Sequence, residues 1–416
     1  AVAFQQRLID FPFIFRHYKT LEFAAQVLQI ISGLQITSWA DTRIRPEDVT
    51  IRRISGALTN AVFFVSCTSP VKIPTILLRI YGPSSGSLIS RPRELHILHK
   101  LSSTYAIGPR VYGTFENGRL EEYFESTTLT ANDIRDPLIS RWIGARMAEF
   151  HSVDIDVVAV PSESGSRKAS LKEAVSSWLK SAHEVFALPT LKPEVRLEID
   201  LPRFEKEWKI YEKWVSQVQD EHSGSAIVFC HNDTQYGNLL RLCNHTFQDD
   251  HRQDVIAFTP ALDRISETPP LQIIVVDFEY AGPNPAAFDI ANHFHEWTAN
   301  YHTSTPHLLD ASRYPTFTQR RNFYTAYIQH SNMLVKSADD PVFEPSDLDQ
   351  LVAALDYQVR VWSPASHAMW AIWGIVQARE DVENGVVEPE FDYIGYAKGR
   401  MESFRKEILD LGVVQR

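Results

Sequence analysis

Five short apolar runs between residues 49 and 124 restrict the possible folds more than any other feature of the sequence. The runs are VTIRRI, AVFFVSC, TILLRIYG, RVYGTF and RLEEYF. The small-residue segment SGALTN separates the first two runs, and Asn117-Gly118 separates the last two. Such runs, bounded by turn residues, are typical of β-strands joined in hairpins. A helix is predicted from Pro92 to Leu101, so the region should form a small, mostly antiparallel sheet with one inserted helix.

The remainder of the chain has mainly helical periodicity after about residue 127. Helices are predicted at Leu21–Ile31, 346–361, 365–380 and 395–410. Short strands are predicted at 226–230, 238–242 and 271–278, and the polar stretch 243–270 is predicted to be an exposed excursion between two hairpin strands. The predicted fold class is therefore α+β, with a small five-stranded lobe and a large, mainly helical lobe.

Composition excludes several classes of function. The 416 residues include 41 Lys and Arg against 52 Asp and Glu, a net charge of −11 with no basic stripe, which argues against nucleic acid as a partner. Three cysteines (Cys67, Cys230 and Cys243) cannot form a disulfide framework, so we predict free thiols and a cytoplasmic location. No apolar run reaches the roughly 18 residues of a membrane span, and no signal peptide is visible.

The strongest chemical signal is the segment HNDTQYGN, from His231 to Asn238, followed 39 residues later by Asp277-Phe-Glu279 at the end of an apolar strand. Asp233 and Asn238 can face one ligand from two sides of a loop, and Asp277 can approach from the neighbouring strand. Carboxylate and amide oxygens suit Mg²⁺, and a remaining carboxylate can accept a proton from a hydroxyl group. The pattern predicts phosphoryl transfer of the protein-kinase type, with Asp233 as base and His231 in a structural role.

The predicted small lobe offers a second half of such a site. The turn that contains Ser55, Gly56, Thr59 and Asn60 could cover phosphate groups with its backbone amides. Arg79, on the third run, stands where a kinase places its phosphate-pairing lysine, and Glu94 on the following helix could hold Arg79 in place. A P-loop is excluded, because the 82–87 loop contains no lysine.

Each feature also has an ordinary interpretation, since isolated HxD triplets and strand-terminal aspartates are common in turns. Their occurrence together and in this order favours a phosphotransferase. Only 11 residues separate Asp277 from Asp289, and Asn232 follows His231 where many protein kinases have arginine. There is no room for an activation segment, so the substrate should be small. A kinase-like binding or scaffold protein is the alternative, although the base and metal positions are intact.

Three segments resemble the signature segments of choline/ethanolamine kinases. They are VFCHNDTQYGNLL (228–240), VVDFEYAGPNPAAFDIANHFHEWTANY (275–301) and SHAMWAIWGIVQA (366–378). The resemblance covers roughly residues 50–410 and is greatest to the choline branch and to fungal members. It places the chain among the protein-kinase-like small-molecule phosphotransferases.

The resemblance implies a protein-kinase-like bilobal fold. Residues 1–122 would form an ATP-binding lobe with a helical N-terminal extension, 123–127 a hinge, and 128–416 a helical lobe with the catalytic loop and choline pocket. The implied activity is ATP-dependent phosphorylation of choline to phosphocholine, the first step of phosphatidylcholine synthesis by the CDP-choline route. Ethanolamine, or both alcohols, is the alternative substrate, and a homodimer is possible.

The resemblance also implies residue roles. Asp233 would be the catalytic base, Asn238 and Asp277 would bind Mg²⁺, and Arg79 with Glu94 would position the ATP phosphates. Further ATP-binding positions would be Ser55, Gly56, Thr59, Asn60, Glu122, Tyr123 and Gln235, with the adenine at the Glu122–Phe124 segment. Pro283 and Pro285 depart from the family pattern, where many members have tyrosine, and we expect them to alter the turn after Asp277.

The chain is rich in aromatic residues, with 9 Trp, 15 Tyr and 23 Phe. The resemblance implies that a quaternary ammonium ion lies beside Glu296 and among the aromatic rings of Tyr301, Trp370, Trp373, Phe391 and Tyr396. Independently, Trp370 and Trp373 are three residues apart on a predicted helix and share a face. Each ring over a quaternary ammonium contributes about 0.5–2 kcal/mol. The alternative is that this pair is ordinary core packing.

Overall fold

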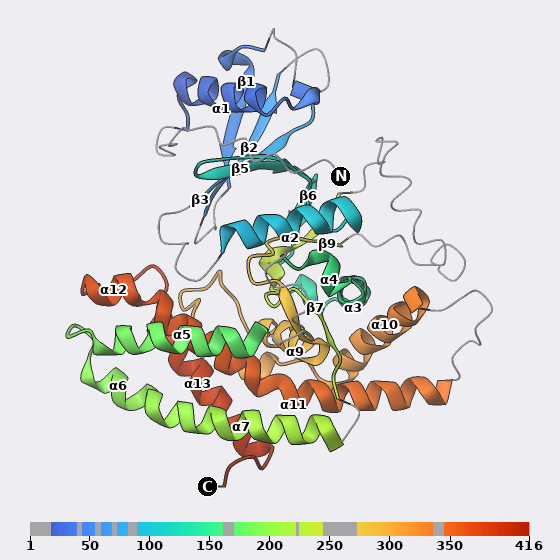
Figure 1. Ribbon diagram of the computed structural model, residues 1–416, viewed down its shortest axis with the longest axis vertical. Helices are drawn as coiled ribbons and strands as arrows, with labels where there is room; N and C mark the ends of the chain where they lie inside the picture. Colours follow the sequence, from blue (N-terminus) through green and yellow to red (C-terminus); the bar gives the residue numbers. More distant parts are fainter. Residues whose placement is uncertain are drawn as a thin grey trace. The chain divides into compact units, whose positions relative to one another are not determined.

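The computed structural model describes residues 18–39, 44–54, 60–68, 73–81, 90–160, 170–221, 224–243, 273–335 and 345–415. The chain divides into two compact units, Ala1–Ser126 with Leu242–His245 and Thr127–Arg241 with Thr246–Arg416 (Figure 1). Ser55, Gly56 and Thr59 of the predicted phosphate turn lie outside the described residues, as does the side chain of Asn60. Nearly all of the predicted 243–270 excursion lies outside them too.

The first unit contains the predicted antiparallel sheet, with strand order β1-β2-β3-β5-β4. Its strands are β1 (Val49–Arg53), β2 (Asn60–Cys67), β3 (Ile76–Tyr81), β4 (Val111–Phe115) and β5 (Gly118–Glu122). The turn at Asn117-Gly118 joins β4 to β5, as predicted. Helix α2 (Arg91–Thr104) follows β3 and is slightly longer than predicted. The predicted five-stranded lobe is confirmed.

Apolar and charged side chains occupy opposite sides of this sheet. Helix α1 (Leu21–Gly33) begins where the Thr20 hydroxyl accepts a hydrogen bond from Phe23 N (3.2 Å). The buried face of α1 packs against alternate sheet residues; this core includes Phe23, Val27, Ile30, Ile31, Phe63, Val65, Ile76, Leu78 and Leu120. Because side chains alternate along a strand, Arg79 of β3 projects from the other face. The sheet therefore presents a charged surface opposite its core.

The second unit is mainly helical. Its longer helices are α3 (Pro137–His151), α5 (Ser170–Ala187), α7 (Leu201–Glu221), α9 (Ala286–Glu296), α10 (Phe317–Val335), α11 (Pro345–Gln377) and α13 (Tyr393–Asp410), and its shorter ones are α4 (Ile155–Val158), α6 (Pro193–Ile199) and α12 (Arg379–Glu383). Helix α11 packs against α13, α9, α5 and α10 (Figure 1). Every residue of α9 is buried, and so is the stretch of α11 from Val361 to Ile372. These two helices form the centre of the unit.

The prediction of separate helices at 346–361 and 365–380 was wrong. A single helix, α11, runs from Pro345 to Gln377 and passes through Pro364. Proline inside a helix removes one backbone hydrogen bond and usually costs about 3 kcal/mol. Here Pro364 lies in the stretch that neighbouring helices enclose on all sides, so tertiary packing outweighs the local preference for a break.

Five short strands form two small sheets beside the polar loops of the second unit. Strand β8 (Leu239–Leu242) pairs antiparallel with β9 (Ile273–Val275), as predicted, and β6 (Ser126–Thr128) completes a sheet of order β6-β8-β9. Strand β7 (Ile227–Cys230) pairs instead with β10 (Gly282–Pro285), which the sequence did not predict.

Pro283 and Pro285 lie within β10 and do not prevent its pairing. Ala286 N donates to Ala226 O at 3.0 Å, so the strand-pairing bonds fall on alternate residues from Ala286 backwards. The two prolines occupy the intervening positions, where a backbone N–H would point away from β7. A proline at such a position costs no ladder hydrogen bond.

Two simpler predictions can be compared with the structure. Cys67, Cys230 and Cys243 are free thiols. Within the described parts of the chain, no helix combines the length and the apolar character needed to cross a bilayer.

Candidate active site

The loop after β7 brings the three predicted catalytic and metal-binding residues together. Asn238, at the end of the short helix η5 (Tyr236–Asn238), donates from Nδ2 to the backbone oxygen and to Oδ2 of Asp233, both at 2.9 Å. Val276 N donates to Asn238 O at 3.0 Å, which places the residue before Asp277 directly against the loop. Asp277 itself has a left-handed backbone (φ 70°), a conformation that non-glycine residues rarely adopt.

Asp233 has the electrostatic environment of a proton acceptor. Burial raises the pKa of its carboxyl group well above the ordinary value, and the nearby charges of Glu296, Asp277 and Glu279 raise it further. A hydrogen bond with Gln235 acts in the opposite direction. A carboxylate whose pKa is shifted toward neutral pH is a better general base than an ordinary one.

The donor atoms of this loop fit a magnesium ion. Because Nδ2 of Asn238 is committed to Asp233, the amide oxygen is the atom that remains for a ligand. The carboxylate of Asp277 adds a second hard oxygen donor on the adjacent segment. Magnesium is commonly held by one or two such protein ligands, with water and phosphate oxygens completing its octahedral shell.

Asn232 fixes the shape of the loop. Its backbone is left-handed (φ 66°), a conformation that asparagine tolerates better than most residues. Its Nδ2 donates to Tyr280 O at 2.8 Å, and its Oδ1 accepts from Asn284 Nδ2 at 2.8 Å. Asn232 therefore ties the catalytic loop to β10 and to the segment after Asp277.

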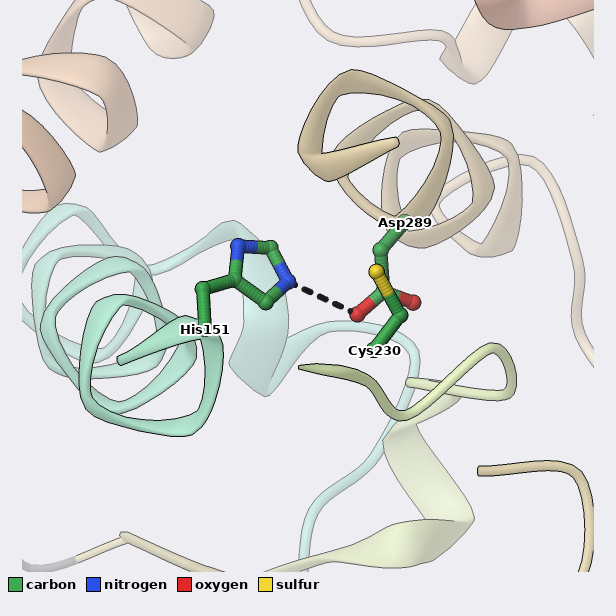
Figure 2. Close-up of side chains that lie close together, drawn as sticks. All are labelled: His151, Cys230 and Asp289. Carbon is green, nitrogen blue, oxygen red and sulfur yellow. Dashed lines mark hydrogen bonds and ion pairs between the residues drawn. The ribbon is translucent and has the colours of Figure 1, made fainter. Parts of the chain in front are cut away.

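A buried carboxylate anchors the start of the loop. Asp289 accepts hydrogen bonds from the backbone nitrogens of His231 (3.0 Å) and Asn232 (2.8 Å), and its Oδ2 lies 3.0 Å from His151 Nε2 (Figure 2). Burial opposes ionisation, but the hydrogen bond and charge of His151 bring the pKa of Asp289 below its ordinary value. Asp289 is thus an ionised structural residue.

His151, Cys230 and Asp289 resemble a set of metal ligands, but protein groups satisfy their donor atoms. His151 Nδ1 lies 2.9 Å from the Tyr327 hydroxyl, and the Cys230 thiol donates to Asn284 O at 3.3 Å. Burial keeps the pKa of the Cys230 thiol well above its ordinary value, so the sulfur remains protonated. We therefore interpret this cluster as support for the loop.

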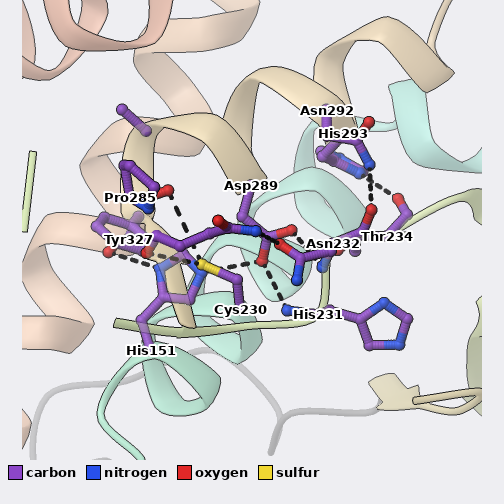
Figure 3. Close-up of polar contacts among 12 residues, drawn as sticks. His151, Cys230, His231, Asn232, Thr234, Pro285, Asp289, Asn292, His293 and Tyr327 are labelled. Atoms are coloured by element: carbon purple, nitrogen blue, oxygen red, sulfur yellow. Dashed lines mark hydrogen bonds and ion pairs between the residues drawn. The ribbon is translucent and has the colours of Figure 1, made fainter. Parts of the chain in front are cut away.

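One face of α9 supplies most of the support for the site. Asp289, Asn292, His293 and Glu296 are spaced i, i+3, i+4 and i+7, and such residues share one face of a helix. Asn292 Nδ2 donates to Asn232 O at 3.0 Å, and His293 Nδ1 donates to Thr234 O at 2.9 Å (Figure 3). Three loop residues, His231, Asn232 and Thr234, thus bond to the α9 face. Of these four α9 residues, only Glu296 had a role predicted from the sequence.

The predicted aromatic residues also lie together. Ring centroids are 5.3 Å apart for Trp370 and Trp373, 6.0 Å for Trp373 and Tyr396, and 5.8 Å for Phe391 and Tyr396. Asn292, which donates to Asn232 O of the loop, also accepts a hydrogen bond from the Trp370 indole. The aromatic cluster therefore lies near the catalytic loop.

The two tryptophans also bond to the loop region. Trp370 Nε1 donates to Asn292 Oδ1 at 2.6 Å, and Trp373 Nε1 donates to the Tyr280 hydroxyl at 2.8 Å. Trp370 is buried, with 5 % of its surface exposed, so its ring contributes to the core as well as to the cluster.

Glu296 lies at the end of the α9 face, between the aromatic cluster and Arg400. Its Oε2 accepts from the Tyr301 hydroxyl at 2.7 Å, and its Oε1 accepts from Arg400 Nη2 at 3.1 Å. The prediction that Glu296 supplies a nearby negative charge did not foresee this arginine. An arginine on a helix with a mixed polar pattern gives no sequence signal of burial.

Comparison with known proteins identifies the family. The family model described as choline/ethanolamine kinase matches residues 51–405. The chain belongs to the choline/ethanolamine kinase family. It is 35 % identical over 444 aligned residues to choline kinase of Schizosaccharomyces pombe, covering 96 % of this chain and 90 % of that protein. It is 26 % identical to ethanolamine kinase of Saccharomyces cerevisiae, with coverages of 95 % and 78 %.

Solved structures of family members have the same fold. The choline kinase from Cryptosporidium parvum superposes with a TM-score of 0.69 at 22 % identity, covering 94 % of this chain and 97 % of that one. The Plasmodium vivax ethanolamine kinase gives a TM-score of 0.64 at 20 % identity, covering 97 % and 98 %. The protein-kinase-like bilobal fold predicted from the sequence is thereby confirmed.

In the first unit of this kinase, the predicted Arg79 and Glu94 belong to one buried charge cluster. Arg79 Nε donates to Glu121 at 3.3 Å, while Glu94 accepts from Arg119 and from Arg91, both at 2.7 Å. Burial alone would raise the pKa of Glu94, but the charges of Arg119, Arg79 and Arg91 lower it to about 2. The cluster therefore holds its carboxylates ionised beside Arg79.

Arg119 and Glu121 of this cluster were not predicted from the sequence. Arg119 lies directly opposite Arg79 in the β3–β5 register, and its Nε donates to Glu121 at 2.9 Å. The signal was available, because two charged residues at alternate positions of a predicted buried strand need partners on the same face.

The remaining predicted ATP-binding residues lie in two places. Glu122, at the end of β5, accepts from Arg110 N at 3.2 Å, and the Tyr123 ring lies 4.7 Å from the Phe64 ring. Gln235 belongs to the second unit, where its side chain hydrogen-bonds with Asp233. Their contacts with nucleotide stay predictions.

Proposed function

We propose that this kinase transfers the γ-phosphoryl group of ATP to the hydroxyl group of choline. Membership of the family implies a kinase with ATP as co-substrate. The observation that carries the choline assignment is the aromatic cluster of Trp370, Trp373, Phe391 and Tyr396 beside the catalytic loop. Aromatic faces attract quaternary ammonium ions, which offer no hydrogen-bond donor to other side chains.

The proposed reaction uses Asp233 as the general base. The choline oxygen attacks the γ-phosphorus while Asp233 takes the hydroxyl proton, the bond to the bridging β,γ-oxygen breaks, and ADP leaves with that electron pair. The raised pKa of Asp233 favours proton acceptance. The hydrogen bonds from Asn238 hold the carboxylate in one orientation, so little reorganisation is needed during transfer.

Asn238 and Asp277 would hold the magnesium ion. Bound there, the ion supplies positive charge that offsets the negative charge of the transferred phosphoryl group. Arg79, supported by Glu121, Arg119 and Glu94, is proposed to pair with ATP phosphates. Further proposed ATP contacts are Ser55, Gly56, Thr59, Asn60, Glu94, Glu122, Tyr123 and Gln235.

The predicted boundaries also enter the proposal. Residues 1–122 would form the ATP-binding lobe, 123–127 the hinge, and 128–416 the lobe with the catalytic loop. Product phosphocholine would enter phosphatidylcholine synthesis by the CDP-choline route. A cytoplasmic location and a homodimer stay predictions of the sequence.

Ethanolamine is the second candidate substrate. Relatives of this chain include proteins named choline kinase, ethanolamine kinase and choline/ethanolamine kinase. A primary ammonium seeks hydrogen-bond acceptors, and both oxygens of Glu296 already accept bonds from protein donors. That arrangement favours choline. A silent scaffold is disfavoured by the coherent geometry of Asp233, Asn238 and Asp277.

One experiment tests the assignment. Purified protein is given Mg-ATP with choline or ethanolamine, and ADP release is followed in parallel. We expect neither alcohol to be turned over when EDTA removes the metal. When magnesium is present, we expect a higher kcat/KM for choline than for ethanolamine. Asp233→Ala should reduce turnover by about 10²–10⁴-fold while Mg-ATP still raises the melting temperature. Undiminished turnover by that variant would refute the proposed role of Asp233.

A further inference from the structure

We propose that Arg400 is a positioning residue for the end of the substrate site that receives the ammonium group. This inference rests on the proposed function. Arg400 lies on α13, is fully buried, and donates from Nη2 to Glu296 Oε1 (3.1 Å) and from Nε to the Tyr396 hydroxyl (3.0 Å). One side chain thus connects two predicted substrate residues that come from different helices.

The contacts of Arg400 restrict both partners. Its guanidinium carbon lies 5.1 Å from the centre of the Tyr396 ring, so it contacts the face of the ring as well as the hydroxyl. Glu296 has one oxygen bonded to Arg400 and the other to the Tyr301 hydroxyl. With both oxygens held, the carboxylate has one orientation, and Tyr301 and Tyr396 are fixed relative to it.

The other side of Arg400 contacts a hydrogen-bonded network that runs from His367 to Glu407. Arg400 Nη1 lies 3.4 Å from His367 Nδ1, and arginine can only donate, so Nδ1 accepts and His367 carries its proton on Nε2. That Nε2 faces Glu407 Oε1 at 3.7 Å. Burial and the charge of Arg400 keep the pKa of His367 well below its ordinary value, which agrees with a neutral ring.

The network continues to α9. The Ser363 hydroxyl donates to Glu407 Oε1 at 3.0 Å, so its oxygen is available to accept from His295 Nε2 at 2.9 Å. His295 directly precedes Glu296 in α9. The arginine therefore contacts a neutral histidine on one side and pairs its charge with Glu296 on the other.

This geometry has a consequence for substrate binding. A buried carboxylate without a counter-charge is costly and tends to reorient or to recruit other donors. Arg400 supplies that counter-charge and leaves Glu296 in place before any substrate arrives. Loss of Arg400 should therefore weaken binding of the cationic alcohol and leave the nucleotide side unaffected.

The test is a calorimetric titration of choline into wild type and variants, without ATP. Arg400→Met should weaken choline binding by about tenfold or more, because a charge-assisted hydrogen bond is lost. Arg400→Lys keeps the charge but not the planar donor geometry, so we expect an intermediate loss. The matched control is Arg405→Met on the same helix, since Arg405 binds Glu207 and the backbone oxygens of Ile199 and Asp200 instead.

Melting temperatures and the thermal shift with Mg-ATP are measured for each variant. The inference predicts an unchanged nucleotide shift in Arg400→Met and in Arg400→Lys, and choline affinity within twofold of wild type in Arg405→Met. It is overturned if Arg400→Met binds choline like wild type, or if the control Arg405→Met weakens choline binding as much as Arg400→Met does. It is also overturned if wild type binds no choline. If Arg400→Met does not fold, Arg400→Lys decides, and wild-type affinity in that variant overturns the inference.

Turnover measurements distinguish failure of this inference from failure of the proposed function. Wild type that phosphorylates neither choline nor ethanolamine refutes the proposed function, whatever the arginine variants show. Wild type that phosphorylates choline while Arg400→Lys and Arg400→Met retain its affinity refutes the role of Arg400 alone.

Discussion

Trp373 makes two kinds of contact, and each has a different consequence. Its indole nitrogen donates to the Tyr280 hydroxyl, while its ring lies against Trp370 and Tyr396. The hydrogen bond fixes the orientation of the indole plane. A ring held in this way can meet a cation without first losing side-chain entropy, which favours binding.

We therefore expect Trp373→Ala to raise KM for choline by roughly 2–30-fold, the equivalent of about 0.5–2 kcal/mol of lost cation–π attraction. KM for ethanolamine should change less, because a primary ammonium binds mainly through hydrogen bonds and less through ring faces. Steady-state kinetics with both alcohols measure the difference. Trp214→Ala is the control, since Trp214 is also partly buried and its ring contact is with Tyr211. Equal changes for the two alcohols would contradict the proposed contact.

In the protein without bound substrates, ionisation of Asp233 should lower the free energy of unfolding. Its folded-state pKa is raised, so stability is fully present below the unfolded-state pKa, about 3.9, and is lost as pH rises through the higher folded-state value. Asp233→Asn removes the buried charge. At neutral pH the variant should melt about 1–3 °C higher than wild type, and near pH 3 the two should agree. Scanning calorimetry at both pH values checks this; a variant that melts lower at neutral pH would disprove it.

At the scale of elements, α9 organises the site. Its polar face bonds to the catalytic loop through Asp289, Asn292 and His293 and reaches the aromatic cluster through Glu296. Asn292 also joins α9 to α11, because its Oδ1 accepts from Ser366 Oγ at 2.7 Å as well as from the Trp370 indole. The loop and the aromatic cluster therefore share a support.

Asn292→Ala should lower kcat by about 10–100-fold, since it frees Asn232 O and displaces a loop that must hold Asp233 closely. It also leaves the Trp370 indole nitrogen buried without a partner, at a cost of about 1–3 kcal/mol. Kinetics and thermal melts measure the two effects. Asn322→Ala is the control for kcat, which should stay unchanged, because this half-buried side chain of α10 donates to Pro137 O instead of to the loop. Wild-type kcat in a destabilised Asn292→Ala protein would show that α9 serves stability alone.

The elements also show where sequence reasoning succeeds. The five strands of the first unit and the β8–β9 hairpin follow from local pattern and turn residues, so they could be predicted. The pairing of β7 with β10 depends on contacts remote in sequence, and the continuity of α11 through Pro364 depends on its neighbours. The polar face of α9 was readable as i, i+3, i+4 and i+7, but its partners were not. Arg119 could have been identified from its place on a predicted buried strand, but Arg400 could not, because burial of an arginine on a helix depends on tertiary contacts.

At the scale of the whole molecule, the net charge of −11 should assist capture of a cationic substrate. Raising ionic strength from about 0.05 to 0.5 M shortens the Debye length to a few ångströms. KM for choline should then rise by about 2–5-fold. The uncharged isostere 3,3-dimethyl-1-butanol, a poor substrate by the same reasoning, should show no such dependence. If salt affects both alcohols equally, the effect does not come from substrate charge.

The two ends of the polar face of α9 are seven residues apart, which is two helical turns and about 10 Å. Asp289 at one end sets the loop that meets the hydroxyl group, and Glu296 at the other sets the region that meets the ammonium group. The rigid helix therefore sets the distance between the positions that receive the hydroxyl group and the ammonium group of the substrate. An amino alcohol with one additional methylene would still bind by its ammonium group, but its oxygen would miss the position for transfer, so kcat would fall more than affinity.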